Sequence, residues 1–172
     1  MTNGTTSVQI YRGVALVGGV VYGPSSVQHP LPPGRVALDH QSAAYVQQLG
    51  GNNPDKLDRI TLDGQTVWTR TFAPDFTAPK LTGLDVDDTD HVFVGISQAG
   101  QPAGLEILAP DQTRQALLRL GNATTKLVST HRDAVGNVFN AGHSNGGFTG
   151  MANPVGGLDL LITRNPQITF AP

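Results

Sequence analysis

The stretch Asp133-Ala-Val-Gly-Asn-Val-Phe-Asn140 decides how this chain is interpreted, because its pattern occurs three times. The matching runs span residues 36–46 and 84–94. Each run has an aspartate six positions before an aromatic residue, and these pairs are Asp39 and Tyr45, Asp87 and Phe93, and Asp133 and Phe139. Successive aspartates are 48 and 46 positions apart. Composition alone would give roughly 0.6 such pairs, so three evenly spaced pairs indicate an internal repeat.

The second half of each unit aligns as well. An apolar residue followed by an acid occurs at 57–58, 105–106 and 158–159. The first two pairs start 18 positions after the aspartate of their unit, and the third starts 25 positions after it. This difference indicates a seven-residue insertion in the third unit, within 145–157. A turn and a further apolar run follow in every unit, at 67–72, 115–120 and 168–170.

Each unit is expected to form four short strands joined by turns. Apolar and polar residues alternate with a period of two at 36–38 and 84–86, as in a strand with one buried face. Val92-Phe93-Val94 is β-branched and aromatic, which favours a strand buried more deeply. In the third unit Gly136 and Asn137 supply the chemistry of a hairpin turn.

One segment carries two signals. Residues 113–120 have good helix propensity behind a potential N-cap at Asp111. The repeat alignment favours a strand there, since 67–72 and 115–120 hold the same place in their units. We therefore expect a strand over 113–120.

The motifs also point to a known family. Asp133-x-x-Gly-Asn-Val-Phe-x-x-Gly142, followed by Gly156-Gly157-Leu158-Asp159 and an apolar strand, resembles the bacterial propeller-blade repeat of the SBBP type. That family has a D-x-x-G-N-V-Y-V-x-G run, a G-x-D strand, a D-G turn and an outer strand with a tryptophan; Asp63-Gly64-Gln-Thr-Val-Trp68 is similar to the last part. Asp39 and Asp87 lack the Gly-Asn that follows Asp133. The resemblance implies blades of four strands in a β-propeller. Propellers of this repeat family typically occur in secreted or surface proteins of bacteria.

The expected fold is therefore all-β and β-propeller-like, with three four-stranded blades over about 36–83, 84–127 and 128–172. Residues 1–35 are expected to supply N-terminal strands, a hairpin at Gly18-Gly19 and a Pro-rich linker or docking loop over 23–34. Closed propellers have four or more blades. Either residues 8–35 form a degenerate fourth blade, or a second chain or partner completes the ring. The second route is favoured, because 8–35 lack the repeated aspartate and the acidic third strand.

Composition supports this class and excludes others. The chain has 172 residues with 21 Gly and 12 Pro, and only one Glu and three Lys, which argues against a helical bundle. A net charge of −2 disfavours nucleic-acid and membrane-surface partners. Without cysteine there is no disulfide. No signal peptide and no apolar stretch long enough for a transmembrane segment are expected.

The candidates for metal binding are weak. Asp85, Asp87, Asp88 and Asp90 form the densest acidic cluster, a conceivable calcium site. The EF-hand pattern fails, because the sixth and twelfth positions from Asp85 are Asp90 and Ile96 instead of Gly and Glu. Five histidines (His29, His40, His91, His131 and His143) are scattered and lack zinc-ligand spacing. We expect no catalytic residues, no metal and no cofactor, and we assign Asp39, Asp87, Asp133, Gly136 and Asn137 to structural repeat positions.

Two aromatic residues are candidates for binding. Trp68 fits either a ligand-facing surface or packing of an outer strand. Phe148 lies in the inserted loop of the third unit, and loops on a rigid scaffold commonly carry function.

The expected function is a non-enzymatic structural or binding module in a larger assembly, with protein partners or copies of itself. The composition and the start of the chain fit a bacteriophage virion component such as a tail, fibre or capsid-decorating protein. One alternative is a hydrolase or lyase that acts on a saccharide at the propeller axis, which requires the repeated aspartates and the histidines to converge. Another is a fragment of a longer secreted or surface propeller.

Overall fold

The computed structural model describes residues 7–16, 19–28, 33–41, 43–61, 65–145 and 159–165. These residues form thirteen strands, which confirms the predicted all-β class. The described part of the chain contains no helix that could cross a membrane. The chain divides into two compact units, Met1–Thr71 and Phe72–Pro172.

The first unit contains a two-stranded hairpin and a four-stranded sheet. Strands β1 (Ser7–Leu16) and β2 (Gly19–Gln28) pair antiparallel, with Leu16 opposite Gly19. The sheet consists of β3 (Pro33–Leu38), β4 (Ala43–Gln48), β5 (Lys56–Thr61) and β6 (Thr66–Arg70), in this order and all antiparallel.

The hairpin corrects the expectation of a Pro-rich linker over 23–34. Residues 23–28 belong to β2, and Pro24 lies opposite Tyr11. A proline lacks the amide that a sheet interior needs, but both strands of a two-stranded ribbon are edge strands, where proline is tolerated.

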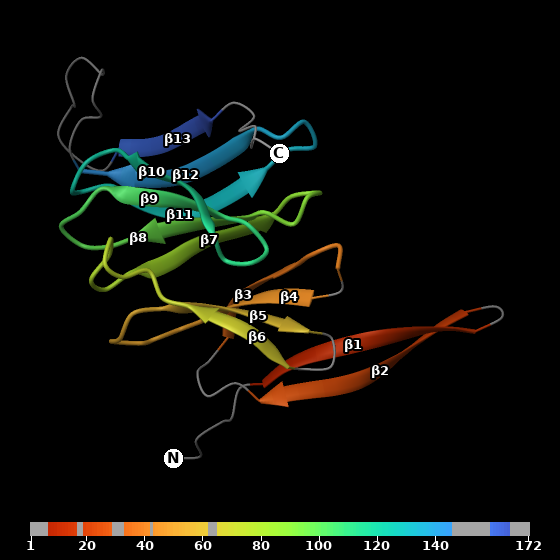
Figure 1. Cartoon of the computed structure of the whole chain (residues 1–172). Helices are drawn as coiled ribbons and strands as arrows, with labels where there is room; N and C mark the ends of the chain where they lie inside the picture. The colour runs from red at the N-terminus through yellow and green to blue at the C-terminus, as the bar shows by residue number, and fades with distance from the viewer. Residues whose placement is uncertain are drawn as a thin grey trace. The chain divides into compact units, whose positions relative to one another are not determined.

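The second unit contains two antiparallel sheets (Figure 1). One consists of β7 (Lys80–Val86), β8 (Val92–Ser97), β9 (Ala103–Leu108) and β10 (Arg114–Leu120). The other consists of β11 (Lys126–Arg132), β12 (Val138–Ser144) and β13 (Asp159–Asn165). The predicted fourth strand of the third repeat, 168–170, lies outside the described residues. None of the sheets closes on itself within the described ranges.

Strand β10 resolves the ambiguous segment as the repeat alignment predicts. Ala116, Leu118 and Leu120 pack against a buried cluster of Phe93, Leu105, Ile107 and Val138. Burial of this apolar row in a sheet outweighs the helix propensity of the segment, because propensity is worth only tenths of a kcal/mol per residue.

The two sheets of the second unit pack face to face along β7, β8 and β11. In the middle of the contact, Gly83 and Gly95 leave room for Thr130, which a Cβ on either glycine would overlap. At one end Ser97 Oγ accepts the amide of Leu127 at 2.8 Å. At the other end the amide of Arg132 donates to Asp85 Oδ2 at 2.7 Å. Small residues and two side-chain-to-backbone bonds thus set the spacing of the sheets.

The strand register revises the alignment of the third unit. Asp58 lies opposite Val46 and Glu106 lies opposite Val94, whereas the equivalent residue of β12, Asn140, lies opposite Thr163. Asp133 and Thr163 are 30 positions apart, against 19 for Asp39 and Asp58. The insertion therefore has eleven residues instead of the seven that the Leu158-Asp159 match indicates.

Candidate functional site

The three repeated aspartates all close the turn between the first and second strands of their sheets. In each turn the aspartate amide donates to the carbonyl four residues later, at 3.0 Å in all three cases. The Oδ1 atom accepts the amides of the second and fourth following residues, which are Gln41 and Ala43, Thr89 and His91, and Val135 and Asn137. The side chain thus satisfies amides that the turn leaves unpaired.

In the second and third turns, the third residue after the aspartate has a left-handed backbone. Its φ is 64° at Asp90 and 88° at Gly136. Glycine adopts this region without a Cβ penalty, and Asp and Asn are the side chains that tolerate it best. The Gly-Asn of the third repeat and the Asp90 of the second are therefore explained by the turn.

The second carboxylate oxygen has a different partner in each turn. Arg59 Nη2 lies 2.7 Å from Asp39 Oδ2, and His91 Nδ1 lies 3.5 Å from Asp87 Oδ2. Asn137 Nδ2 donates to Asp133 Oδ2 at 2.7 Å. This side-chain hydrogen bond, with those from the Asn137 and Val135 amides and the charge of Arg164, outweighs desolvation and lowers the pKa of Asp133. Asp87 and Asp133 are thus each engaged in their own turn.

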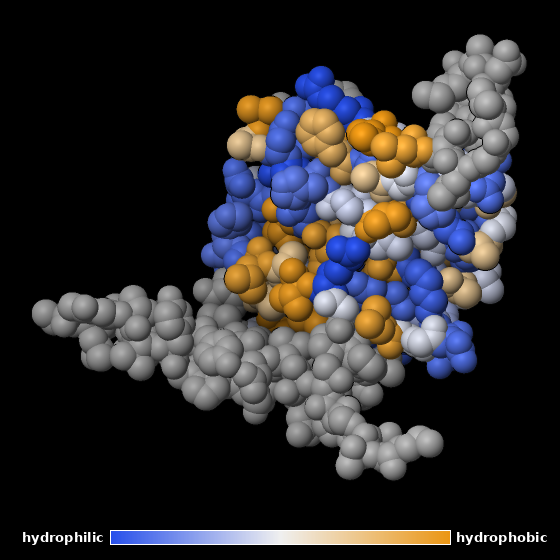
Figure 2. All heavy atoms as spheres, turned by 180° about the vertical axis from the view of Figure 1, so that it is seen from behind, coloured by the Kyte–Doolittle hydropathy of each residue, from blue (hydrophilic) through white to orange (hydrophobic). Residues whose placement is uncertain are grey.

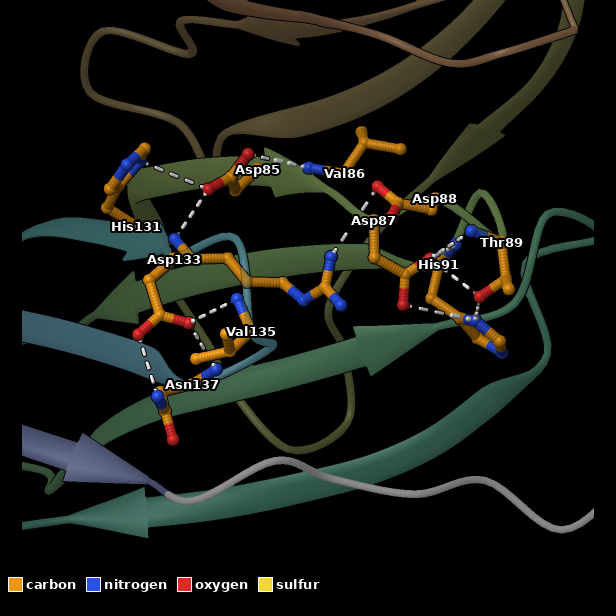
Figure 3. A network of polar contacts seen from close by, with 11 residues as sticks. Asp85, Val86, Asp87, Asp88, Thr89, His91, His131, Asp133, Val135 and Asn137 are labelled. Carbon is orange, nitrogen blue, oxygen red and sulfur yellow. Dashed lines mark hydrogen bonds and ion pairs between the residues drawn. The ribbon is translucent and has the colours of Figure 1, made fainter.

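The aspartates of the calcium candidate do not form one ligand set, and Figure 3 shows the separate partners of Asp85, Asp87 and Asp88. Asp85 Oδ2 accepts the Arg132 amide and lies 3.2 Å from His131 Nδ1. Asp88 is exposed and lies 4.0 Å from Arg132 Nη1. Asp87 and Asp90 belong to the turn itself. No group of three or more acidic or histidine side chains that could hold a metal occurs among the described residues.

The histidines lie in different settings. His40 and His91 are in the equivalent turns of β3–β4 and β7–β8. His131 lies beside Asp85, and His143 is on β12 opposite Lys126. His29 lies outside the described residues.

Trp68 is part of a row across the first sheet. Trp68 is on β6 and lies opposite Arg59 of β5. Its ring is 5.7 Å from that of Tyr45, at an interplanar angle of 50°. The guanidinium of Arg59 lies 5.8 Å from the Tyr45 centroid. This row packs the outer strand against the sheet. Phe148, the other aromatic candidate, lies outside the described residues.

The sequence did not predict that the acids on the third strands of the first two repeat sheets, Asp58 and Glu106, are buried. Asp58 accepts hydrogen bonds from Thr69 at 2.6 Å and from Gln48. Glu106, the sole glutamate of the chain, is fully buried and lies 2.9 Å from Arg114 Nε. Desolvation lowers the pKa of Arg114, but hydrogen bonds to Glu106 and Asp75 outweigh it and raise the pKa. The sequence shows these acids only as an acidic residue that follows an apolar one. Their burial became apparent only from the pairing of the third strand with its two neighbours.

The last described sheet has an apolar face that the described residues leave exposed. On the equivalent face of the second sheet, Phe93 is 2% and Leu105 is 0% exposed. The matching residues of the third sheet, Phe139 and Ile162, are 36% and 68% exposed, and the adjacent Leu160 is 75% exposed. Figure 2 shows apolar residues at the surface of the described part, as orange patches among polar ones. We call Phe139, Leu160 and Ile162 the uncovered face.

Comparisons with known proteins assign no family. No family model matches the chain, and no curated protein matches it. Among solved structures, the chain is similar to the crystal structure of a protein of unknown function from Bacteroides caccae, with 10% identity and a TM-score of 0.49. The similarity covers 84% of this chain, which spans about half, 50%, of the other.

Proposed function

We propose that this chain is a non-enzymatic structural and binding module, built of propeller-type blades, that associates with a second copy through the uncovered face. The observation that carries the proposal is the contrast between Leu105, which is fully buried, and its equivalent Ile162, which is 68% exposed. Large apolar patches on a soluble protein commonly mark interaction sites.

The arrangement of the second unit supports blades of the propeller type. The first strands of its sheets, β7 and β11, lie against each other (Figure 1). Asp85 and His131, which hold equivalent repeat positions 46 residues apart, are in contact between them. In a propeller the inner strands of neighbouring blades meet in this way around the axis.

The repeat also indicates what covers the uncovered face. Phe93 and Leu105 are covered by Val138 of the next sheet, so the surface that fits such a face is another sheet of the same kind. A second copy of this chain supplies that sheet without any new partner, and repeating units generally need neighbours to bury their faces. The virion setting stays a prediction, since no described feature of the chain bears on it.

The native mass tests the proposal. Ile162→Lys places a charge on the uncovered face, and Val135→Lys is the matched control, because Val135 is 69% exposed in a turn outside that face. We expect the wild type and Val135→Lys to be oligomeric by light scattering, and Ile162→Lys to be monomeric with unchanged circular dichroism. Loss of one buried isoleucine alone removes about 1.5–3 kcal/mol of association free energy per site.

A wild type that is monomeric at about 100 μM, a concentration that detects Kd values into the high micromolar range, contradicts association with a second copy. It would instead favour a segment of a longer propeller, in which the neighbouring sheet belongs to the same polypeptide. An oligomer that Ile162→Lys leaves intact would place the interface on another surface.

A further inference from the structure

A pocket of about 710 Å³ lies between the two sheets of the second unit, within the range of small-molecule sites. Its described lining comes from the start of β7, the end of β8, the start of β11 and the end of β12. The aspartate turns lie at the opposite ends of these strands. The pocket is therefore a feature separate from the turns.

Equivalent residues of the two sheets line this pocket in pairs. Lys80 and Lys126 are 46 positions apart, as are Thr82 and Val128, and Ser97 and His143. Thr82 and Val128 each lie where the pairing with the next strand shifts register, between Leu81 and Gly83 and between Leu127 and Ser129. Such bulges redirect side chains and are common beside functional sites. The repeat thus brings two equivalent sets of side chains to one pocket.

The charged side chains that line the pocket are all basic in the described part of the chain. The chain has only three lysines, and two of them, Lys80 and Lys126, line it together with His143. Lys126 lies directly opposite His143 on β11 and β12, and Lys80 lies opposite Ser97 on β7 and β8. None of the described lining residues is acidic. In a chain of net charge −2, this local concentration of positive charge favours an anion.

Two polar atoms in the lining residues have unused hydrogen-bonding capacity. Thr82 Oγ1 and His143 Nδ1 are buried and have no hydrogen-bond partner in the part of the chain that the structure describes. Buried polar atoms are nearly always paired, so each such atom needs an explanation. Both residues line the pocket, so each brings a buried polar atom without a described partner to this site.

The other lining residues are apolar or small. Ala78, Ala99, Leu127 and Val128 contribute aliphatic surface to the wall. Ser97 is engaged with Leu127, and Gln98 Oε1 accepts the amide of Ala78 at 2.9 Å, so both support the wall. We propose that this pocket binds a small organic anion, with a carboxylate or phosphate group between Lys80, Lys126 and His143 and an apolar body against Leu127 and Val128.

A titration with phenyl phosphate, benzoate and phenol tests this site, followed by amide chemical shifts of the full chain. We expect phenyl phosphate or benzoate to bind with a Kd of about 1 mM or tighter, as befits ligands of this size, and phenol to bind more weakly. The shifts should concentrate at residues 77–82, 97–99, 126–128 and 143. The better of the two anions identifies the head group.

Two variants with the same change of charge provide the control. Lys126→Gln removes an exposed lysine that lines the pocket, and Lys56→Gln removes the one lysine that does not line it. We expect Lys126→Gln to weaken anion binding by about fivefold or more, the effect of losing one charge-assisted contact, and Lys56→Gln to leave it unchanged. No shifts at about 10 mM anion, equal affinity for phenol, or equal weakening in both variants would overturn the proposal.

Discussion

At the scale of single residues, the side chains of the repeated aspartates stabilise the hairpin turns by accepting hydrogen bonds from backbone amides. The Oδ1 atom of Asp133 accepts the amides of Val135 and Asn137, and its Oδ2 atom accepts the Asn137 side chain. These bonds favour the charged carboxylate, which is the reason for its lowered pKa. The same bonds from backbone amides occur at Asp39 and Asp87, so the feature that defines the repeat in sequence is a requirement of the hairpin turn.

Asp133→Asn is expected to lower the melting temperature at pH 7. A carboxyl group with a lowered pKa contributes stability above its unfolded pKa of about 3.9, and this stability is lost as the pH falls through the folded value. The difference between variant and wild type should therefore shrink when melting is followed down to about pH 3. Asp88→Asn is the control, because the Asp88 side chain is 89% exposed. A difference that persists unchanged in acid would contradict this origin.

The two buried threonine hydroxyls of the sheet interface should respond in opposite directions. Thr82→Val removes a hydroxyl that has no partner in the described structure, and is expected to raise the free energy of unfolding by up to about 1 kcal/mol. Thr130→Val removes a hydroxyl that donates to Asn140 Oδ1 at 2.8 Å and should lower it by about 1–2 kcal/mol. Urea denaturation of both variants measures these two changes in the free energy of unfolding. A loss of stability in Thr82→Val would show that its hydroxyl is already bonded in the free protein.

At the scale of elements, close approach of β11 to β7 and β8 depends on two glycines. A Cβ at Gly83 would lie 2.6 Å from the Thr130 amide nitrogen, and one at Gly95 would lie 2.5 Å from Thr130 Oγ1. Real Cβ atoms do not approach other atoms so closely, so a side chain there must separate the sheets. Thr130 therefore packs against backbone, and its hydroxyl is directed to Asn140.

Gly83→Ala is expected to lower the free energy of unfolding by about 2–3 kcal/mol, because the added methyl overlaps Thr130 in a packed interface. Gly100→Ala is a useful comparison, since a Cβ there meets nothing within 4 Å and only its φ of 76° opposes the change. That variant should lose about 1 kcal/mol. Equal losses in urea denaturation would mean that backbone conformation, and not sheet packing, limits position 83.

At the scale of the whole molecule, one repeat serves two purposes. Its regular sheets present equivalent faces, of which the second is covered and the third is not, and this difference supports association with a second copy. Its strand ends present equivalent side chains, and Lys80 and Lys126 converge at one pocket because the two sheets pack in register. The two sites adjoin on β12 and β13, because His143 of the pocket lies opposite Leu160 of the uncovered face.

Much of the fold could be read from local chemistry. The aspartate-to-aromatic spacing located the turn and the second strand of the three repeat sheets, because turn and strand preferences are properties of a few consecutive residues. The strand at Arg114–Leu120 followed from the repeat against its own propensity. The segment 23–28 was misread as a linker, because Gly and Pro at an edge strand look like loop residues.

The amino-acid sequence by itself determined the all-β class, the repeat and its turns, since each depends on interactions between residues near one another along the chain. Only the tertiary structure decided that Thr163 replaces an acid on the third strand, that Asp85 meets His131, and that Lys80, Lys126, Thr82 and His143 surround one pocket. Apart from the neighbours Lys80 and Thr82, the residues that these features bring together are 17 to 63 positions apart in the chain. Their partners are chosen by strand register and by how two sheets pack, which no local pattern specifies.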